Sequence, residues 1–277
     1  MRRATRVRLR SNIVNGLLDH GGRSRADGGH GAIVLLHGLM GRGCTWRRQI
    51  PWLRRYGHVF TFDAAFHQGA FDAPDPIPPK EIATERFVAD VAELITWIDR
   101  GSVVLIGHSM GGLHAWCTAA QFPELVSALV VEDMAPDYRG RTIGDWAPWF
   151  SSWPDRFADL DEAVAMFGPI AGRYFYEAFD DGHLHGSIPV WGAIAEEWGT
   201  REFWSQWDAV DAPALLIEAE YSVTPSGQMA QMAARGLHRR HDQSAYLTVA
   251  GAGHLVHDDR PEVYRGAVEA FLSGLAD

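Results

Sequence analysis

The chain has 277 residues, of which 47% are hydrophobic and 22% charged, and its formal net charge is −10 at pH 7. This length and composition are typical of one soluble α/β domain, or of a domain that carries a sizeable insertion. The acidic balance argues against nucleic-acid binding, which needs a basic face to neutralise phosphates.

The N-terminal segment is rich in arginine, with Arg2, Arg3, Arg6, Arg8 and Arg10 among its first ten residues. No apolar stretch or small-residue cleavage site follows them, so we do not expect a secretory signal. Residues 6–18 alternate between apolar and polar side chains, which predicts two short antiparallel strands. A loop rich in glycine, arginine and serine follows over residues 21–31.

Apolar runs and helical patterns alternate between residues 32 and 136. Buried parallel strands are continuous apolar runs, and such runs predict strands at 32–36, 59–62, 103–106 and 126–131. Apolar positions at three- and four-residue steps predict helices at 44–56, at 81–98 and from the third of these strands to 122. Strands that alternate with helices in this way imply βαβ units and a parallel sheet.

This alternation stops at Asp137. From there to about Trp207 the pattern is helical, with interruptions expected at Pro148, Pro154, Gly168-Pro169 and Gly186. Seven of the eleven tryptophans fall in this segment: Trp146, Trp149, Trp153, Trp191, Trp198, Trp204 and Trp207. We interpret residues 137–207 as a helical cap, or lid, inserted into a core formed by residues 1–136 and 208–277. Strands at 213–218 and 245–249 and helices at 226–237 and 261–275 complete that core.

The most informative stretch is Gly107-His108-Ser109-Met110-Gly111, which joins an apolar strand to a helix. A serine on such a tight turn projects its hydroxyl outward, and the dipole at the helix N-terminus favours negative charge that develops beside it. The two glycines remove Cβ atoms where the chain must pack closely. Ser109 is therefore a candidate nucleophile.

Taken in chain order, these motifs resemble those of the α/β-hydrolase superfamily over residues 30–275. They are His37-Gly38, Asp63, the Ser109 turn, Asp133-Met134-Ala135-Pro136 and Gly251-Ala252-Gly253-His254. The resemblance implies an α/β fold with a mostly parallel eight-stranded sheet, helices on both faces and an inserted helical cap. It also implies that His254 is the base for Ser109, and that the backbone N–H groups of Leu39 and Met110 form the oxyanion hole.

The acid that would orient His254 has two candidates. Many relatives place it after the strand that is here 214–218, but Ser222 stands where an aspartate is expected. The preceding strand ends in Asp133, as in the esterase branch of the superfamily, so we assign Asp133 and keep Glu220 as the alternative. Glu132 is expected to face the opposite side of that strand end.

Further residues are assigned to the pocket or to structure. His37 is expected to brace the oxyanion loop, and the residues expected to line the pocket are His37, Trp146, Trp149, Trp153 and Trp191. We expect structural or packing roles for the other polar residues near the motifs, namely Asp63, His67, His108 and His257.

The resemblance implies a serine hydrolase that cleaves a carboxylic ester or thioester of a small to medium hydrophobic molecule through an acyl-enzyme on Ser109. Two alternatives stay open. The first is a C–C bond hydrolase, lyase or transferase that uses the same three residues. The second is a non-catalytic ligand-binding protein of this fold. The expected partner is a small-molecule substrate, and both a monomer and a homodimer are compatible with the sequence.

No cofactor, metal ion or membrane span is expected, because no phosphate-binding glycine motif and no apolar run of roughly 18 residues occurs. His183, His185, His238 and His241 lack carboxylate or cysteine support and are interpreted as exposed surface histidines. The two cysteines, Cys44 and Cys117, form no CxxC motif and are compatible with a reducing compartment, so we expect a cytoplasmic location.

Overall fold

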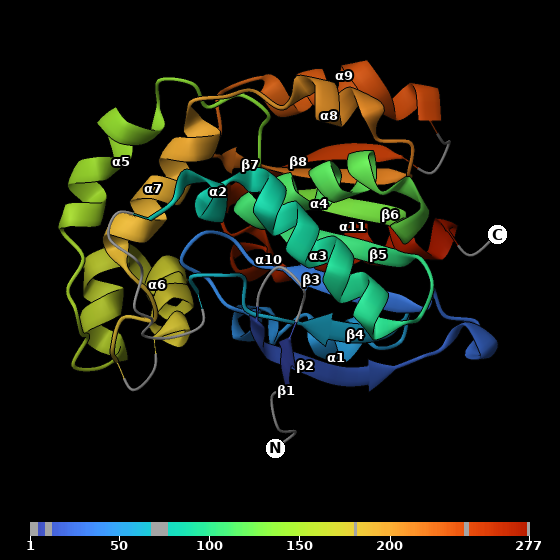
Figure 1. The fold of residues 1–277 in the computed structure, drawn as a ribbon, viewed down its shortest axis with the longest axis horizontal. Helices are drawn as coiled ribbons and strands as arrows, with labels where there is room; N and C mark the ends of the chain where they lie inside the picture. The colour runs from blue at the N-terminus through green and yellow to red at the C-terminus, as the bar shows by residue number, and fades with distance from the viewer. Residues whose placement is uncertain (1–4, 9–12, 68–76, 180–181, 241–243, 276–277) are drawn as a thin grey trace.

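The computed structural model describes residues 5–8, 13–67, 77–179, 182–240 and 244–275. Within these ranges the centre of the molecule is an eight-stranded sheet with the order β1-β2-β4-β3-β5-β6-β7-β8 (Figure 1). The strands are β1 Thr5–Arg8, β2 Ile13–Gly22, β3 Ala32–Leu36, β4 His58–Thr61, β5 Val103–His108, β6 Val126–Glu132, β7 Ala214–Tyr221 and β8 Ala245–Gly253. Strands β3 to β8 pair in parallel and β2 is antiparallel to both of its neighbours, which confirms the predicted fold class.

The central strands are apolar throughout because helices cover both faces of the sheet. Along β3, Val34 and Leu36 point into one apolar cluster, whereas Ile33 and Leu35 point into the other. The first cluster includes side chains from α3 (Thr84–Ile98) and α4 (Met110–Gln121). The second includes side chains from α11 (Pro261–Gly274), which covers the opposite face. Burial on both faces is what turns the alternating pattern into a continuous apolar run.

The other helical elements connect the strands or belong to the segment between β6 and β7. They are η1 Arg25–Asp27, η2 Gly43–Trp46, α1 Ile50–Leu53, α2 Pro79–Ile82, η3 Pro123–Leu125, α5 Thr142–Ser151, α6 Leu160–Ala178, α7 Ile188–Gly199, α8 Trp204–Ala209, α9 Gln228–Arg240 and α10 Val256–Asp259. In the described part of the chain, no helix combines the length and the apolar character that crossing a membrane requires.

Two predicted helix boundaries are wrong. The single helix expected over 44–56 is divided into η2 and the one-turn α1, because Pro51 lacks an N–H and is tolerated only in the first turn of a helix. Conversely, α5 continues through Pro148, where a break was expected. The rings of Trp146 and Phe150 pack on each other across this proline, and Trp146 also packs on Trp198 of α7, which favours the helical conformation there.

Between β6 and β7 the chain forms a helical insertion, which we define as residues 137–207. Figure 1 shows α5, α6 and α7 gathered at one end of the sheet. The expected break at Gly168 is present as a kink inside α6, where φ is 83° and ψ is 172°. The insertion contains its own aromatic contacts, such as Trp146 with Trp198 at 5.4 Å between ring centroids. Its treatment as a separate cap stays a prediction.

Candidate active site

Ser109 lies between β5 and α4 in a backbone conformation that few residues other than glycine adopt, with φ 52° and ψ −125°. Its neighbours make this turn possible. A Cβ at Gly107 would lie 2.3 Å from the Gly111 carbonyl oxygen, and one at Gly111 would lie 2.2 Å from the Leu36 carbonyl oxygen. Only glycine fits at both positions. Strained backbone of this kind costs about 1–3 kcal/mol and is concentrated at functional sites.

The carboxyl end of the sheet brings three predicted site residues to one edge. Ser109 follows β5, Asp133 follows β6 and His254 follows β8. Because these strands are parallel, their carboxyl ends lie on the same side of the molecule. Asp133 also adopts a positive φ of 47°, and its backbone N–H donates to the Ile217 carbonyl at 2.8 Å. Because of this turn, the Asp133 side chain does not continue the alternation of side chains along β6.

Asp133 and His254 are in direct contact. His254 Nδ1 lies 2.7 Å from Asp133 Oδ2, and the other carboxylate oxygen accepts the Ala219 backbone N–H at 2.9 Å. The Asp133 side chain is 0% exposed, whereas that of His254 is 25% exposed. A buried carboxylate that accepts from Nδ1 favours the tautomer in which Nε2 carries a lone pair. The exposed part of the ring is thus suited to accept a proton.

Glu220, the alternative acid, is exposed and makes a different contact. Its Oε2 accepts the Gly251 backbone N–H at 2.6 Å, which ties β7 to the end of β8, just before His254. Ser222, at the position where an aspartate was expected, bonds locally to the Thr224 hydroxyl at 2.8 Å. Both residues stabilise the chain around the site.

His108 has the packing position expected for it. Its ring is buried and its Nε2 lies 3.0 Å from the His254 carbonyl oxygen, to which it donates. Burial first, and then the nearby His254 and His257 rings, hold the pKa of His108 well below its usual range. A neutral His108 thus supports the backbone of His254 from beneath.

A cavity of about 670 Å³ opens above Ser109 and His254. Its wall comes mostly from aromatic and aliphatic side chains of the helical insertion and the Leu39 loop: Leu39, Met40, Trp146, Trp149, Phe150, Phe167, Pro169, Ile170, Tyr174, Phe175 and Trp198. Among the described lining residues Asp259 is the one acidic side chain, and arginine and lysine are absent. Such a cavity suits a neutral, largely apolar ligand.

Two tryptophans that were expected to line the pocket do not contribute to this cavity. Trp191 is buried against the core, where its ring stacks on His67 at 5.4 Å and its Nε1 donates to the Phe66 carbonyl at 3.0 Å. Trp153 packs behind the cavity wall, with its ring centroid 4.7 Å from that of Phe175. Both expectations are corrected, because a helical insertion of this size also needs buried aromatic residues of its own.

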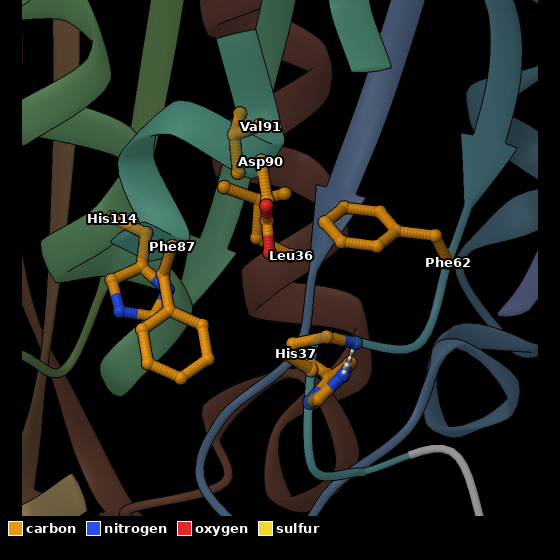
Figure 2. Close-up of a pocket in the computed structure, with 9 residues that line it drawn as sticks. Leu36, His37, Phe62, Phe87, Asp90, Val91 and His114 are labelled. Carbon is orange, nitrogen blue, oxygen red and sulfur yellow. Dashed lines mark hydrogen bonds between the residues drawn. The ribbon is translucent and has the colours of Figure 1, made fainter. Parts of the chain in front are cut away.

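His37 also lies outside the large cavity, so its predicted place in the pocket is corrected. Its Nδ1 donates to the Gly38 carbonyl at 2.8 Å, and its Nε2 accepts the Ala64 backbone N–H at 2.9 Å. The ring borders a separate small space of about 10 Å³ that Phe62, Phe87 and His114 also line. Figure 2 shows how these side chains lie. Burial lowers the pKa of His37, which keeps the ring neutral and able to make both bonds.

The two predicted oxyanion donors are the backbone N–H groups of Met110, which directly follows Ser109, and of Leu39, which follows β3. Met110 is the first residue of α4, and a backbone N–H at that position has no partner within its own helix. Leu39 borders the same cavity as Ser109. The next residue, Met40, has a φ of 63°, and a Cβ at Gly41 would lie 2.2 Å from the Tyr174 hydroxyl, so the loop packs tightly under α6.

Four histidines were expected on the surface: His183, His185, His238 and His241. His183 is exposed as expected, but His185 is buried, and that expectation is wrong. Its loop packs inward near His37 and His67, and burial in this region is the main reason why the pKa of each of those two rings is lowered. The side chain of His238 and all of His241 lie outside the described residues. In the described ranges, no three His, Cys, Asp or Glu side chains come together as a group that could hold a metal ion.

Several lining residues have no distinguishing signal in the sequence. Phe167, Tyr174, Phe175 and Trp198 all border the cavity. Their aromatic composition is evident from the sequence, but the face that each presents depends on how α6 and α7 pack against the core. Tyr174 is 2% exposed, and its ring lies 6.0 Å from that of His108.

Comparison with known proteins agrees with this architecture. Residues 33–267 match the alpha/beta hydrolase family, and the chain belongs to that family. It is 27% identical to the sn-1-specific diacylglycerol lipase of Mus musculus, over 87% of this chain and 81% of the relative. It is 26% identical to the esterase YbfF of Escherichia coli, over 87% of this chain and 92% of the relative.

A solved structure extends the similarity of fold to almost the whole chain. The crystal structure of E-2-(acetamidomethylene)succinate hydrolase superimposes with a TM-score of 0.79 and covers 98% of this chain and 99% of its own. At 19% sequence identity this similarity shows the fold alone. The family and the curated relatives together support an enzyme of the hydrolase class.

Proposed function

We propose that this protein is a serine hydrolase that cleaves an ester or thioester of a small to medium hydrophobic molecule. The observation that carries the proposal is the 2.7 Å contact between His254 Nδ1 and the buried Asp133 carboxylate, beside the strained turn of Ser109. In this scheme Ser109 is the nucleophile, His254 the base and then the acid, and Asp133 the group that orients His254.

The reaction would proceed through an acyl-enzyme. His254 Nε2 takes the proton of the Ser109 hydroxyl as the oxygen attacks the carbonyl carbon, and later returns it to the leaving alcohol or thiol. The Leu39 and Met110 backbone N–H groups stabilise the oxyanion, and each such donor is worth about 3–4 kcal/mol of barrier lowering. A water molecule deprotonated by His254 then attacks the acyl-enzyme and releases the acid.

The lining of the cavity supports a substrate with a neutral, apolar acyl group. Its wall is aromatic, and its one described acidic side chain is Asp259, whose carboxylate already accepts the Gly253 N–H at 2.7 Å. No arginine or lysine is present among the described lining residues to bind a substrate carboxylate. The names of two relatives, a diacylglycerol lipase and an esterase, are consistent with ester cleavage.

Active-site labelling tests the proposal directly. A fluorophosphonate probe should react with the wild-type protein, and Ser109→Ala should abolish both labelling and hydrolysis of p-nitrophenyl butyrate. Circular dichroism of the variant provides the control for folding. A folded wild-type protein that is not labelled would exclude the proposed nucleophile. Labelling without turnover of any ester would instead favour the C–C bond hydrolase or lyase alternative.

A further inference from the structure

A second acid–histidine pair lies next to the contact between Asp133 and His254. The two carboxylate oxygens of Glu132 lie 2.8 and 2.9 Å from His257 Nδ1. The Glu132 side chain is 0% exposed and that of His257 is 1% exposed. Glu132 immediately precedes Asp133, and His257 follows His254 by three residues. The same two segments of the chain therefore supply both pairs.

The two carboxylates diverge at the end of β6. Glu132 is in register with His108 of β5, and it continues the side of β6 on which Ala128 and Val130 face the apolar cluster beneath α11. Asp133 comes after the strand, and its positive φ directs its carboxylate to His254 instead. One strand end thus supplies an acid to each of the two histidines.

Glu132 also fixes the backbone of α10. Its Oε1 accepts the His257 backbone N–H at 3.0 Å, so that one carboxylate holds both the ring and the main chain of His257. The Gln49 amide donates to the His257 carbonyl at 2.8 Å, and the Trp46 ring stacks on the imidazole at 4.6 Å. These contacts anchor the segment from His254 into α10 to the end of β6.

The pair is also favourable electrostatically. Burial by itself would lower the pKa of His257, but the Glu132 charge and hydrogen bond outweigh burial, and the net change in pKa is upward. Other titratable groups also surround the His257 ring. Asp258 Oδ2 lies 4.0 Å from Nε2 and is paired with Arg48 through its other oxygen. The ring centroids of His108, Tyr264 and Tyr174 lie 5.3, 5.9 and 6.1 Å from that of His257. Removing either partner would leave the other buried without its hydrogen bond, which is unfavourable, so the two side chains of Glu132 and His257 are expected to stay paired in the folded protein.

We propose that Glu132 and His257 are positioning residues that hold Asp133 and His254 in register. This inference rests on the proposed serine hydrolase function, because it assigns the pair a role in that reaction. The geometry explains how the pair would act. Asp133 follows β6 and His254 precedes α10, and the Glu132–His257 contact joins the last residue of β6 to α10 within three residues of both. A displacement of about 1 Å in a catalytic group costs on the order of 100-fold in rate.

Glu132→Gln tests the role with little change in shape. Glutamine keeps an acceptor for the His257 N–H groups but removes the charge that holds the ring. For p-nitrophenyl butyrate we expect kcat to fall about 10- to 100-fold while KM changes less than about threefold, because positioning acts on the transition state. The acid limb of the kcat/KM pH profile should move to lower pH, because a loosened Asp133 stabilises protonated His254 less.

Two further variants separate positioning from general stability. Asp90→Asn removes another buried carboxylate, whose Oδ2 lies 2.8 Å from Arg86 Nε. Both residues are on α3 and not on the segments that hold Asp133 and His254. Asp90→Asn should lower the urea midpoint by an amount similar to Glu132→Gln and leave kcat unchanged. If Glu132→Gln does not fold, Glu132→Gln/His257→Gln restores a neutral hydrogen-bonded pair in the same space, and we expect the same loss of kcat.

The possible results lead to different conclusions. Fluorophosphonate labelling of the wild type, together with unchanged kcat and an unchanged pH profile in the Glu132 variants, would overturn the positioning role and leave the proposed function intact. An equal loss of kcat in Asp90→Asn would also overturn it, because stability alone would then explain the effect. A wild-type protein that is not labelled would remove the proposed function, and the positioning role with it.

Discussion

Asp133 occupies a backbone conformation that aspartate tolerates better than most residues, and this turn decides where its carboxylate lies. The carboxylate is buried between His254 Nδ1 and the Ala219 N–H. Glu220 is on β7, directly after Ala219. Its side chain is exposed, and its carboxylate accepts the Gly251 N–H. The two candidate acids thus have opposite environments, although both precede His254 in the chain.

This contrast gives a direct test of the acid. Asp133→Asn should lower kcat for p-nitrophenyl butyrate about 10³- to 10⁴-fold, because asparagine favours the tautomer of His254 that cannot accept the Ser109 proton. Glu220→Gln serves as the matched control and should change kcat less than about threefold. Steady-state kinetics of the two purified variants provide the measurement. A large loss in Glu220→Gln and a small one in Asp133→Asn would move the acid to the later loop.

At the level of elements, the kink in α6 shapes the cavity. Gly168 interrupts the helix, Pro169 follows it, and residues from Phe167 to Ala171 all border the cavity. A glycine with φ 83° permits this bend, and Pro169 favours a kink because it has no N–H to donate to the preceding turn. The bend therefore exposes Ile170 to the space above Ser109.

Ile170 is a suitable site to test whether this wall limits the acyl group. Ile170→Phe adds volume to the cavity lining, and we expect kcat/KM for p-nitrophenyl octanoate to fall about 10-fold relative to p-nitrophenyl butyrate. Met166→Phe places the same ring on the exposed side of α6 and should leave this ratio unchanged. Identical ratios in the wild type and in Ile170→Phe would show that the acyl group does not reach this wall.

At the level of the whole molecule, buried neutral histidines make the fold sensitive to acid. Burial lowers the pKa of His37, His67 and His108, and it lowers the pKa of His114 from 6.5 to about 3. In each case the unfolded chain binds a proton more readily than the folded one. Their contribution to stability is complete above pH 6.5 and is lost as the pH falls below that value. His257 has the opposite sign, since its raised pKa makes its contribution decline as the pH rises.

His114 allows this effect to be measured, because its ring stacks on Phe87 at 4.9 Å and an aromatic replacement keeps that contact. A folded pKa of about 3 implies a loss of about 2 kcal/mol from this residue between pH 7.5 and pH 5. His114→Phe should reduce the wild-type loss over that range by about this amount, as measured by urea unfolding. The exposed His183→Gln is the control. An unchanged pH dependence in His114→Phe would assign the acid sensitivity to other groups.

Much of the architecture could be predicted because it depends on local patterns. The apolar runs of β3, β5 and β6 and the glycines around Ser109 are readable from neighbouring residues alone. Predictions from local patterns were wrong at two prolines, Pro51 and Pro148. Pro51 lies in a new one-turn helix where periodicity predicted one continuous helix, whereas Pro148 lies inside α5, where a break was predicted.

The order of strands and helices and the turn at Ser109 can be read from the amino-acid sequence, because periodicity and the size of glycine act over a few residues. The contact of Asp133 with His254, that of Glu132 with His257 and the burial of Trp191 away from the cavity depend on the folded structure. These contacts join segments up to 125 residues apart, and their geometry depends on how the sheet edge and the helical insertion pack together.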